Sequence, residues 1–222
     1  MKPRLALFDL DDTLLHGDTD ALWCDFLVGR GLLDGASFTR RNEELAVRYR
    51  AGTVGALEFA EFYLGTLAGR TASQWEPLRR EFQQECIVPR ISRAAMALVR
   101  GHLEAGERVV LTTATNRFLT ELTARHLGIA DVLATEPQLR DGVFTGHVEG
   151  VPNMREGKVT RLHAWLAQQG LALADLHSTA YSDSINDLPL LQAVDVAVAV
   201  HPDAKLADVA RERAWRVMAL CD

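Results

Sequence analysis

Three aspartates stand close together near the start of the sequence, at the end of a short apolar run. The run covers residues 5–10 and is typical of a buried strand, with Asp9, Asp11 and Asp12 at its carboxyl end. Carboxylates crowded this closely repel one another unless a cation or a proton relieves the repulsion. Magnesium usually takes one or two protein carboxylates besides phosphate and water. The cluster therefore favours a magnesium-assisted phosphoryl-transfer site, while an acidic helix N-terminus is an equally good interpretation of this segment alone.

A second acidic segment shifts the balance towards chemistry. Asp183 and Asp187 follow another apolar run at residues 178–181, so two acidic loops leave the carboxyl ends of two expected strands. Such loops can hold a metal ion from opposite sides, with phosphate and water completing its ligands. Two acidic loops on one sheet edge are harder to explain as helix caps than one.

Two further residues could bind the phosphate itself. Thr113 ends a third apolar run, and its hydroxyl and the following N–H suit phosphate oxygens near a helix expected to begin at Asn116. Lys158 opens another expected helix, where a lysine alone would more often face solvent. In company with the aspartates, Lys158 could instead neutralise the phosphate and keep the nucleophile ionised.

The elements that position these residues alternate between strand and helix. This alternation predicts an α/β fold with a parallel sheet, whose ligands bind beyond the carboxyl ends of the strands. Strands are expected at residues 5–10, 109–113, 178–181 and 194–200, and helices at 92–104, 116–127 and 158–169.

Residues 17–87 interrupt this alternation, because they contain several helical stretches and no strand-like run. We interpret them as an inserted helical cap, with residues 1–16 and 88–222 forming the catalytic core. Residues 138–148 contain Asp141-Gly142 between two alternating runs, which predicts a β-hairpin. The cap helices are expected at residues 21–29, 36–50, 57–67 and 73–86.

Composition narrows the functional class. The 222 residues carry a net charge of −6 with basic and acidic residues interleaved, which argues against nucleic acid as a partner. Cys24, Cys86 and Cys221 are too scattered for a disulfide framework or a paired metal site, so we interpret them as reduced. No apolar stretch is long enough to cross a membrane, and a cytoplasmic protein is expected. Nothing in the sequence fixes an oligomeric state.

The motifs together resemble a known superfamily. The segment at residues 8–14, FDLDDTL, followed in order by Thr113, Lys158, and Asp183 with Asp187, resembles the four motifs of the haloacid dehalogenase superfamily. The helical segment between the first two motifs looks like the C1-type cap of its phosphoserine-phosphatase-like branch. The resemblance covers essentially the whole chain and implies a Rossmann-like core with this inserted cap.

The resemblance also implies how the reaction proceeds. Asp9 attacks phosphorus, and Asp11 protonates the leaving oxygen and then activates water against the aspartyl-phosphate. Thr113 and Lys158 bind the transferred phosphate. Because dehalogenases of the superfamily lack a second aspartate in the first motif, Asp11 favours a phosphatase over a dehalogenase.

The implied cofactor is Mg²⁺. By the same resemblance it is held by Asp9, by the backbone carbonyl of Asp11 and by Asp183. Asp187 orients either a metal-bound water or Lys158, and Asn186 assists in substrate binding.

The expected partner is a small phosphate ester, and Asp18 bears on which one. Phosphoserine phosphatases hold the substrate ammonium with an acid nine residues after the nucleophile, the spacing of Asp18, and the alternative role for Asp18 is to cap a helix. They use a cap arginine for the substrate carboxylate, and an approximate ungapped match from Gly52 places Glu61 at that position, which argues against phosphoserine. Arg48 or Arg50 could substitute if the cap helices are shifted. An amino phosphate without a carboxylate, such as histidinol phosphate, fits these acids better.

Two other functions share these motifs. A phosphotransferase or phosphomutase would pass the aspartyl-phosphate to an acceptor other than water, and the core motifs do not separate it from a phosphatase. A catalytically silent phospholigand-binding protein would be expected to have lost some of the motif residues. This chain keeps all six, which are Asp9, Asp11, Thr113, Lys158, Asp183 and Asp187. His16 follows the first motif and is expected to be structural.

Overall fold

The computed structural model describes residues 2–50 and 53–220, without the side chains at positions 46, 49 and 50. Cys221 and the side chain of Arg50, both singled out from the sequence, lie outside this description. Cys24 and Cys86 are free thiols, as expected. Within the described ranges, no helix has both the length and the apolar character needed to cross a bilayer.

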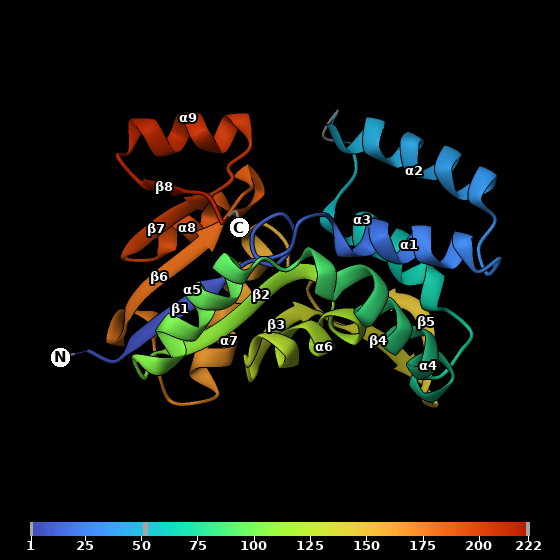
Figure 1. Cartoon of the computed structure of the whole chain (residues 1–222), viewed down its shortest axis with the longest axis horizontal. Helices are drawn as coiled ribbons and strands as arrows, with labels where there is room; N and C mark the ends of the chain where they lie inside the picture. The colour runs from blue at the N-terminus through green and yellow to red at the C-terminus, as the bar shows by residue number, and fades with distance from the viewer. Residues whose placement is uncertain (1, 51–52, 221–222) are drawn as a thin grey trace.

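One parallel sheet is the main structural element of the fold (Figure 1). In the described part it has six strands in the order β3-β2-β1-β6-β7-β8. The central strand β1 is buried on both faces, which explains why its sequence is a continuous apolar run. The strands are β1 Arg4–Phe8, β2 Arg108–Asn116, β3 Asp131–Thr135, β6 His177–Ser182, β7 Val196–Val200 and β8 Arg216–Met218.

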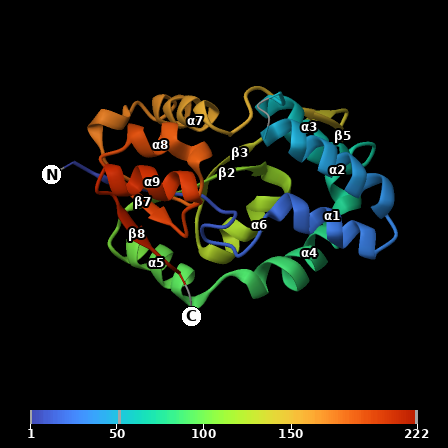
Figure 2. The same ribbon diagram turned by 90° about the horizontal axis from the view of Figure 1, so that it is seen from above.

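Helices cover both faces of this sheet (Figure 2). Ala6 and Phe8 of β1 belong to a core shared with α5 and α6, whereas Leu5 and Leu7 belong to a second core shared with α7, α8 and α9. Successive side chains of a strand point to opposite faces, so one short strand contributes to both cores. The flanking helices are α5 Arg93–Glu104, α6 Arg117–Leu127, α7 Glu156–Ala167, α8 Leu188–Ala193 and α9 Ala204–Glu212.

The insertion between β1 and α5 is helical, as predicted. Trp23 of α1 meets Trp75 of α4 at 5.5 Å between ring centroids and Phe82 at 5.1 Å, so aromatic side chains form much of its interior. The elements are α1 Thr19–Gly29, α2 Gly35–Arg50, α3 Ala56–Leu64 and α4 Ala72–Phe82, followed by a π-helical turn Gln83–Ile87. Short 3₁₀ turns lie at Gly65–Leu67, Val88–Arg90, Leu173–Asp175 and Ile185–Asp187.

The predicted hairpin is confirmed and packs against this insertion. Strands β4 Pro137–Arg140 and β5 Val143–Val148 are antiparallel, and Asp141 and Gly142 both have positive φ at their turn. Phe144 of β5 exchanges backbone hydrogen bonds of 2.9 and 3.0 Å with the chain at Gly69 and Arg70. The hairpin therefore reaches across from the sheet to the helices of the insertion.

The predicted α/β fold class is confirmed, but two edge strands were missed. β3 has only five residues after a glycine-ended helix, and β8 has three, largely exposed ones, so neither has a long apolar run. The helix expected to run to residue 86 changes to π-helical geometry after Phe82, and the one expected to run to residue 67 ends at Leu64, before Gly65.

Candidate active site

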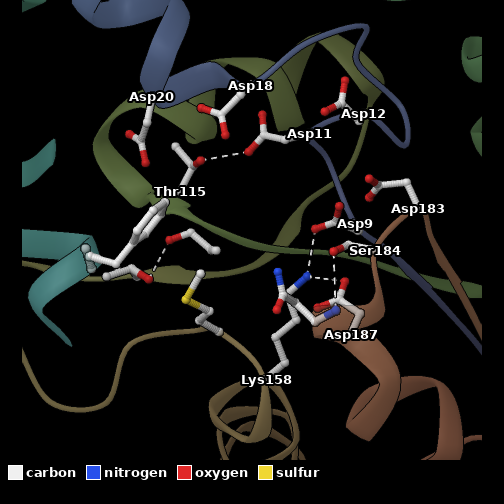
Figure 3. A pocket seen from close by; sticks show the side chains of 16 residues that line it. Asp9, Asp11, Asp12, Asp18, Asp20, Thr115, Lys158, Asp183, Ser184 and Asp187 are labelled. Atoms are coloured by element: carbon white, nitrogen blue, oxygen red, sulfur yellow. Dashed lines mark hydrogen bonds and ion pairs between the residues drawn. The ribbon is translucent and has the colours of Figure 1, made fainter. Parts of the chain in front are cut away.

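A cavity of about 210 Å³ lies where β1, β2, β3 and β6 end (Figure 3). Seven of its lining residues are aspartates, and Lys158 is the only lysine or arginine among the described ones. The cavity is thus strongly acidic with one cationic position. It is lined by Asp9, Asp11, Asp12, Asp18, Asp20, Phe59, Ala60, Ala114, Thr115, Thr135, Met154, Lys158, Asp183, Ser184, Asn186 and Asp187.

Lys158 joins the two acidic loops. Its Nζ donates to Asp9 Oδ1 at 2.7 Å and to Asp187 Oδ2 at 2.6 Å, and the Lys158 side chain is only 3% exposed. Asp187 Oδ2 also accepts a hydrogen bond of 2.8 Å from Ser182 Oγ. The ammonium therefore fixes one oxygen of Asp9, while Asp187 holds the ammonium in place.

Asp11 is held by hydroxyl groups and a backbone N–H. Thr115 Oγ1 donates to Asp11 Oδ2 at 2.7 Å, and Thr19 donates to Asp11 Oδ1 from its N–H at 2.8 Å and from its hydroxyl. These contacts keep the carboxyl group at the cavity wall between α1 and β2. No lysine or arginine in the described chain hydrogen-bonds to it, so Asp11 and Asp9 have different environments.

A single hydroxyl lies between Asp9 and Asp183. Thr13 Oγ1 is 3.2 Å from Asp9 Oδ2 and 3.1 Å from Asp183 Oδ1, and it accepts from the Asp183 N–H at 3.0 Å. A hydroxyl has one proton, so it can donate fully to only one of the two carboxylates. The pair is therefore short of positive charge at the position where the two loops meet.

Burial raises the pKa of several of these carboxyl groups. Burial raises the pKa of Asp9 to about 6 in spite of Lys158, and burial together with the charges of Asp18 and Asp9 raises that of Asp11 to about 7. Burial and the charge of Asp9 raise the pKa of Asp183 to about 8. For Lys158, burial favours the neutral form, but Asp187 and Asp9 outweigh it and raise the pKa. One ammonium does not balance this much buried acid.

The donor set fits a divalent cation of the magnesium type. Asp9 and Asp183 lie on either side of the shared Thr13 hydroxyl and offer the oxygen ligands that magnesium prefers. No three His, Cys, Asp or Glu side chains of the described residues converge into a ready-made metal site. Magnesium needs only one or two protein carboxylates, so this does not conflict with the fit.

Asp18 and Asp20 form the acidic wall opposite Lys158. Asp18 Oδ1 accepts from the N–H of Ala21 at 2.8 Å and is the N-cap of α1, so the capping interpretation of Asp18 is correct and the residue also lines the cavity. Asp20 lies in the first turn of α1, and its Oδ1 accepts a hydrogen bond of 3.4 Å from Asn116 Nδ2. Burial and the charges of Asp18 and Asp11 raise the pKa of Asp20.

Most residues selected from the sequence line this one cavity, and Thr113 is the exception. Thr113 is fully buried and does not line the cavity, although its hydroxyl is 3.5 Å from Asp11 Oδ2. Sequence reasoning missed Thr115, although it lies two residues after Thr113, and it missed Asp20. The residues brought to the cavity as predicted are Asp9, Asp11, Asp18, Lys158, Asp183, Asn186 and Asp187.

The residues considered for a substrate carboxylate lie elsewhere. Glu61, at the position of the family arginine, accepts from His147 Nδ1 at 3.1 Å on the hairpin. Arg48 pairs with Glu58 at 2.6 Å and lines a different depression between α2 and α3. Arg48 therefore does not take the place of the missing arginine. His16 is outside the cavity, 5.8 Å from the His201 ring.

A family model connects this site to a class of enzymes. The model for haloacid dehalogenase-like hydrolases matches residues 6–192, which include every motif residue. The chain belongs to the haloacid dehalogenase-like hydrolase family. The predicted resemblance is confirmed.

Relatives within the haloacid dehalogenase-like family are phosphatases. A histidinol-phosphatase of Neisseria meningitidis is 39% identical over 217 residues, 97% of this chain and 98% of the relative. The phosphoserine phosphatase SerB1 of Mycobacterium tuberculosis is 35% identical over 96% of this chain and 69% of its own length. A solved structure from Bordetella pertussis, of unknown function, matches with a TM-score of 0.94 and 46% identity over 99% of this chain and 100% of that one. The predicted enzyme class, phosphoric monoester hydrolase, is confirmed.

Proposed function

We propose that this phosphatase hydrolyses a small, positively charged phosphate ester without a carboxylate, of the histidinol phosphate type, with Asp9 as the nucleophile. The observation that carries the proposal is the distribution of charge in the cavity. Lys158 and the Asp9–Asp183 pair form one end, and Asp18 and Asp20 form the other. The first end suits a phosphate with its metal, and the second suits a cation.

The reaction proceeds in two steps on this chain's own residues. An oxygen of Asp9 forms a bond to phosphorus while the ester P–O bond breaks, and the leaving oxygen takes a proton from Asp11. Water then attacks the aspartyl-phosphate, Asp11 takes the proton of the water, and Asp9 and inorganic phosphate are released. Lys158 holds Asp9 in position throughout through its 2.7 Å contact.

Mg²⁺ is part of the proposal, with Asp9, Asp183 and the backbone carbonyl of Asp11 as the groups that would hold it. When bound, the ion would neutralise charge on the phosphate and on the crowded carboxylates. Asp187 contacts Lys158 and Ser182, so we assign it the orientation of Lys158 and not direct metal binding.

Removal of divalent cations is expected to abolish turnover. Chelator should lower kcat/KM at least about a hundredfold, and added Mg²⁺ should restore it, because metal charge contributes several kcal/mol to such transition states. Mg²⁺ at about 100 times its Kd should also raise the free energy of unfolding by about 2.7 kcal/mol. Thermal unfolding with and without Mg²⁺ measures this second effect, which Asp183→Asn should diminish. Full activity in chelator would contradict the proposal.

The substrate assignment depends on which charges the acidic wall can accept. A substrate carboxylate would need a cation, and Lys158 is already engaged by Asp9 and Asp187. An ammonium or imidazolium group would instead meet Asp18 and Asp20. The relative named histidinol-phosphatase supports this choice, and the relative named phosphoserine phosphatase defines the competing substrate.

A panel of three esters tests the substrate class. Histidinol phosphate should have a kcat/KM at least about thirtyfold above that of phosphoserine, because a buried unpaired charge costs about 2 kcal/mol or more. A chromogenic ester, p-nitrophenyl phosphate, reports phosphatase activity without either charged group. Phosphoserine as the best substrate would contradict the assignment, and phosphate release without an added acceptor would argue against a phosphotransferase.

Two substitutions in α1 test whether Asp20 binds the cationic group of the substrate. Asp20→Asn should raise the KM for histidinol phosphate about tenfold, since a hydrogen bond to a charged group contributes at least about 1.5 kcal/mol. Asp25→Asn is the matched control, because Asp25 is exposed on the same helix and does not line the cavity. Equal KM values for the two variants would show that Asp20 does not meet the substrate cation.

We also propose that residues 17–87 form a cap over the core, made of residues 1–16 and 88–222. Support comes from Asp18, the N-cap of α1, from Asp20 of α1 and from Phe59 of α3, all of which line the cavity. A cytoplasmic location is part of the proposal and is supported by the free thiols of Cys24 and Cys86.

A further inference from the structure

Strand β2 leaves its regular pairing with β3 where it reaches the cavity. Up to Thr113 the two strands pair one for one, and the next pair joins Asn116 to Thr135. Ala114 and Thr115 are therefore left out of the ladder and form a bulge. Bulges next to active sites commonly re-aim side chains. Both bulged residues line the cavity.

The bulge directs two hydroxyl groups onto Asp11. Thr115 Oγ1 donates to Asp11 Oδ2 at 2.7 Å, and Thr113 Oγ1 is 3.5 Å from the same oxygen. The Thr115 N–H donates to Thr113 Oγ1 at 3.2 Å, which ties the two threonines to each other. The shape of the bulge thus decides where the proton-transferring carboxyl group and the predicted phosphate-binding Thr113 lie.

Two side chains from outside β2 hold this bulge. Thr135 Oγ1 donates to the carbonyl of Ala114 at 2.6 Å and accepts from the Asn153 N–H at 3.0 Å. Asn153 Nδ2 lies 3.0 Å from the carbonyl of Thr113 and 2.8 Å from that of Leu133. The backbone carbonyls of Thr113 and Ala114 are therefore fixed separately, one by each side chain.

The side-chain NH₂ group of Asn153 makes hydrogen bonds, but its side-chain oxygen makes none within the part of the chain that the structure describes. Asn153 is fully buried, and its Oδ1 has no hydrogen-bond partner among the described residues. Such an orphan acceptor costs stability, so the side chain is retained for what its NH₂ group holds. The same loop leads to Lys158 through Gly157, where a Cβ would lie 2.1 Å from the carbonyl oxygen of Pro152. Asn153 thus connects the bulge to the close-packed start of the helix that carries Lys158.

We propose that Thr135 and Asn153 are positioning residues that set the Ala114–Thr115 bulge and the adjoining Thr113 relative to Asp9 and Lys158. The inference rests on the proposed phosphatase function and adds two residues that do not themselves react. Misplacement of a reacting group by about 1 Å can cost a hundredfold in rate. Loss of either contact should therefore impair phosphate binding and turnover beyond any loss of stability.

The test compares Thr135→Val with Thr135→Ser on p-nitrophenyl phosphate with Mg²⁺. Valine keeps the shape but removes the hydroxyl, and we expect kcat/KM to fall about a hundredfold. Serine keeps the hydroxyl and should stay within about threefold of wild type, since its contact energy is nearly unchanged. Inorganic phosphate should inhibit Thr135→Val more weakly than wild type, with an inhibition constant about tenfold higher. The inhibition constant for Thr135→Ser should be unchanged.

Thr123→Val is the matched control for loss of a buried hydroxyl. Thr123 is fully buried on α6, donates to Gln83 Oε1 at 3.0 Å and does not line the cavity. It should lose thermal stability with phosphate inhibition unchanged. The proposal is wrong if Thr135→Val resembles Thr123→Val in both thermal stability and phosphate inhibition. It is also wrong if kcat/KM falls as far in Thr135→Ser as in Thr135→Val.

Two further measurements keep the test decisive. If Thr135→Val does not fold, Thr135→Ala removes the same hydroxyl without presenting a second methyl to the buried carbonyl, and Asn153→Ala removes the other contact. Both should weaken phosphate inhibition, and unchanged inhibition in both would overturn the inference. Wild-type protein without activity on any ester would contradict the proposed function instead, and phosphate binding by calorimetry would still compare the variants.

Discussion

Asp9→Asn is expected to eliminate phosphate release from every ester that the wild-type protein hydrolyses. The amide oxygen is a poor nucleophile, so no covalent bond to phosphorus can form at this position. We expect a loss of at least about 10⁴ in kcat, equivalent to about 5.5 kcal/mol of barrier. Steady-state kinetics with a chromogenic ester and saturating Mg²⁺ measure this loss.

The variant should remain folded, which separates lost chemistry from lost structure. Burial raises the pKa of Asp9 to about 6, so the ionised carboxylate is destabilised where it lies. A neutral amide removes that cost, and Lys158 keeps its contact with Asp187. The unfolding temperature of Asp9→Asn in chelator should therefore be no lower than that of wild type.

Asp208→Asn provides the matched control for exchange of a carboxylate for an amide. Asp208 is exposed on α9, where it pairs with Arg211, and it does not line the cavity. Its kinetics should equal those of wild type. Residual turnover by Asp9→Asn within tenfold of wild type, with no back-conversion to aspartate, would exclude a covalent intermediate on this residue.

The sequence was informative about the active site because parallel sheets gather distant residues at one edge. Asp9, Lys158 and Asp187 are up to 178 positions apart in the chain, yet each follows or opens an element whose end faces the same cavity. The position of each short apolar run therefore predicted where its polar neighbours would lie. Carboxylates at strand ends could be placed without knowledge of side-chain contacts.

The contacts themselves could not be predicted from the sequence. Thr115 was overlooked because its hydroxyl reaches Asp11 only through a bulge in β2, and a bulge depends on the pairing with β3. β3 has too short an apolar run to be recognised in advance. Helix geometry posed a similar problem, since Asp18 and Asp20 both suit a first turn. Only the fold shows that Asp18 caps the helix and that both line the cavity.

Lys158→Met is expected to lower both stability and activity, because the lysine lies between two buried carboxylates and donates to both. Its contacts of 2.7 Å to Asp9 and 2.6 Å to Asp187 have no substitute in methionine, which has a similar length. Removing one partner from a buried ion pair costs about 3–5 kcal/mol. For a domain of this size that corresponds to a fall of about 10 °C in unfolding temperature.

The loss of activity should exceed what the loss of stability explains. Without the ammonium, the Asp9 carboxylate loses the contact that orients it, and the cavity loses the lysine proposed to bind the phosphate. We expect kcat/KM to fall at least about a thousandfold at a temperature where the variant is still folded, comparable with removal of a major electrostatic contact. Circular dichroism at the assay temperature establishes that the comparison is made on folded protein.

A double variant separates the two effects of Lys158. Adding Asp187→Asn to Lys158→Met removes one of the two carboxylates left without a cation, and an asparagine oxygen can still accept from Ser182, as Asp187 does at 2.8 Å. The double variant should therefore regain part of the unfolding temperature, while its activity stays as low as that of Lys158→Met. Recovery of stability without activity would mean that the buried charge balance and the catalytic role of Lys158 are distinct. Recovery of both would mean that Lys158 serves only to neutralise Asp187, and its assignment to the phosphate would have to be abandoned.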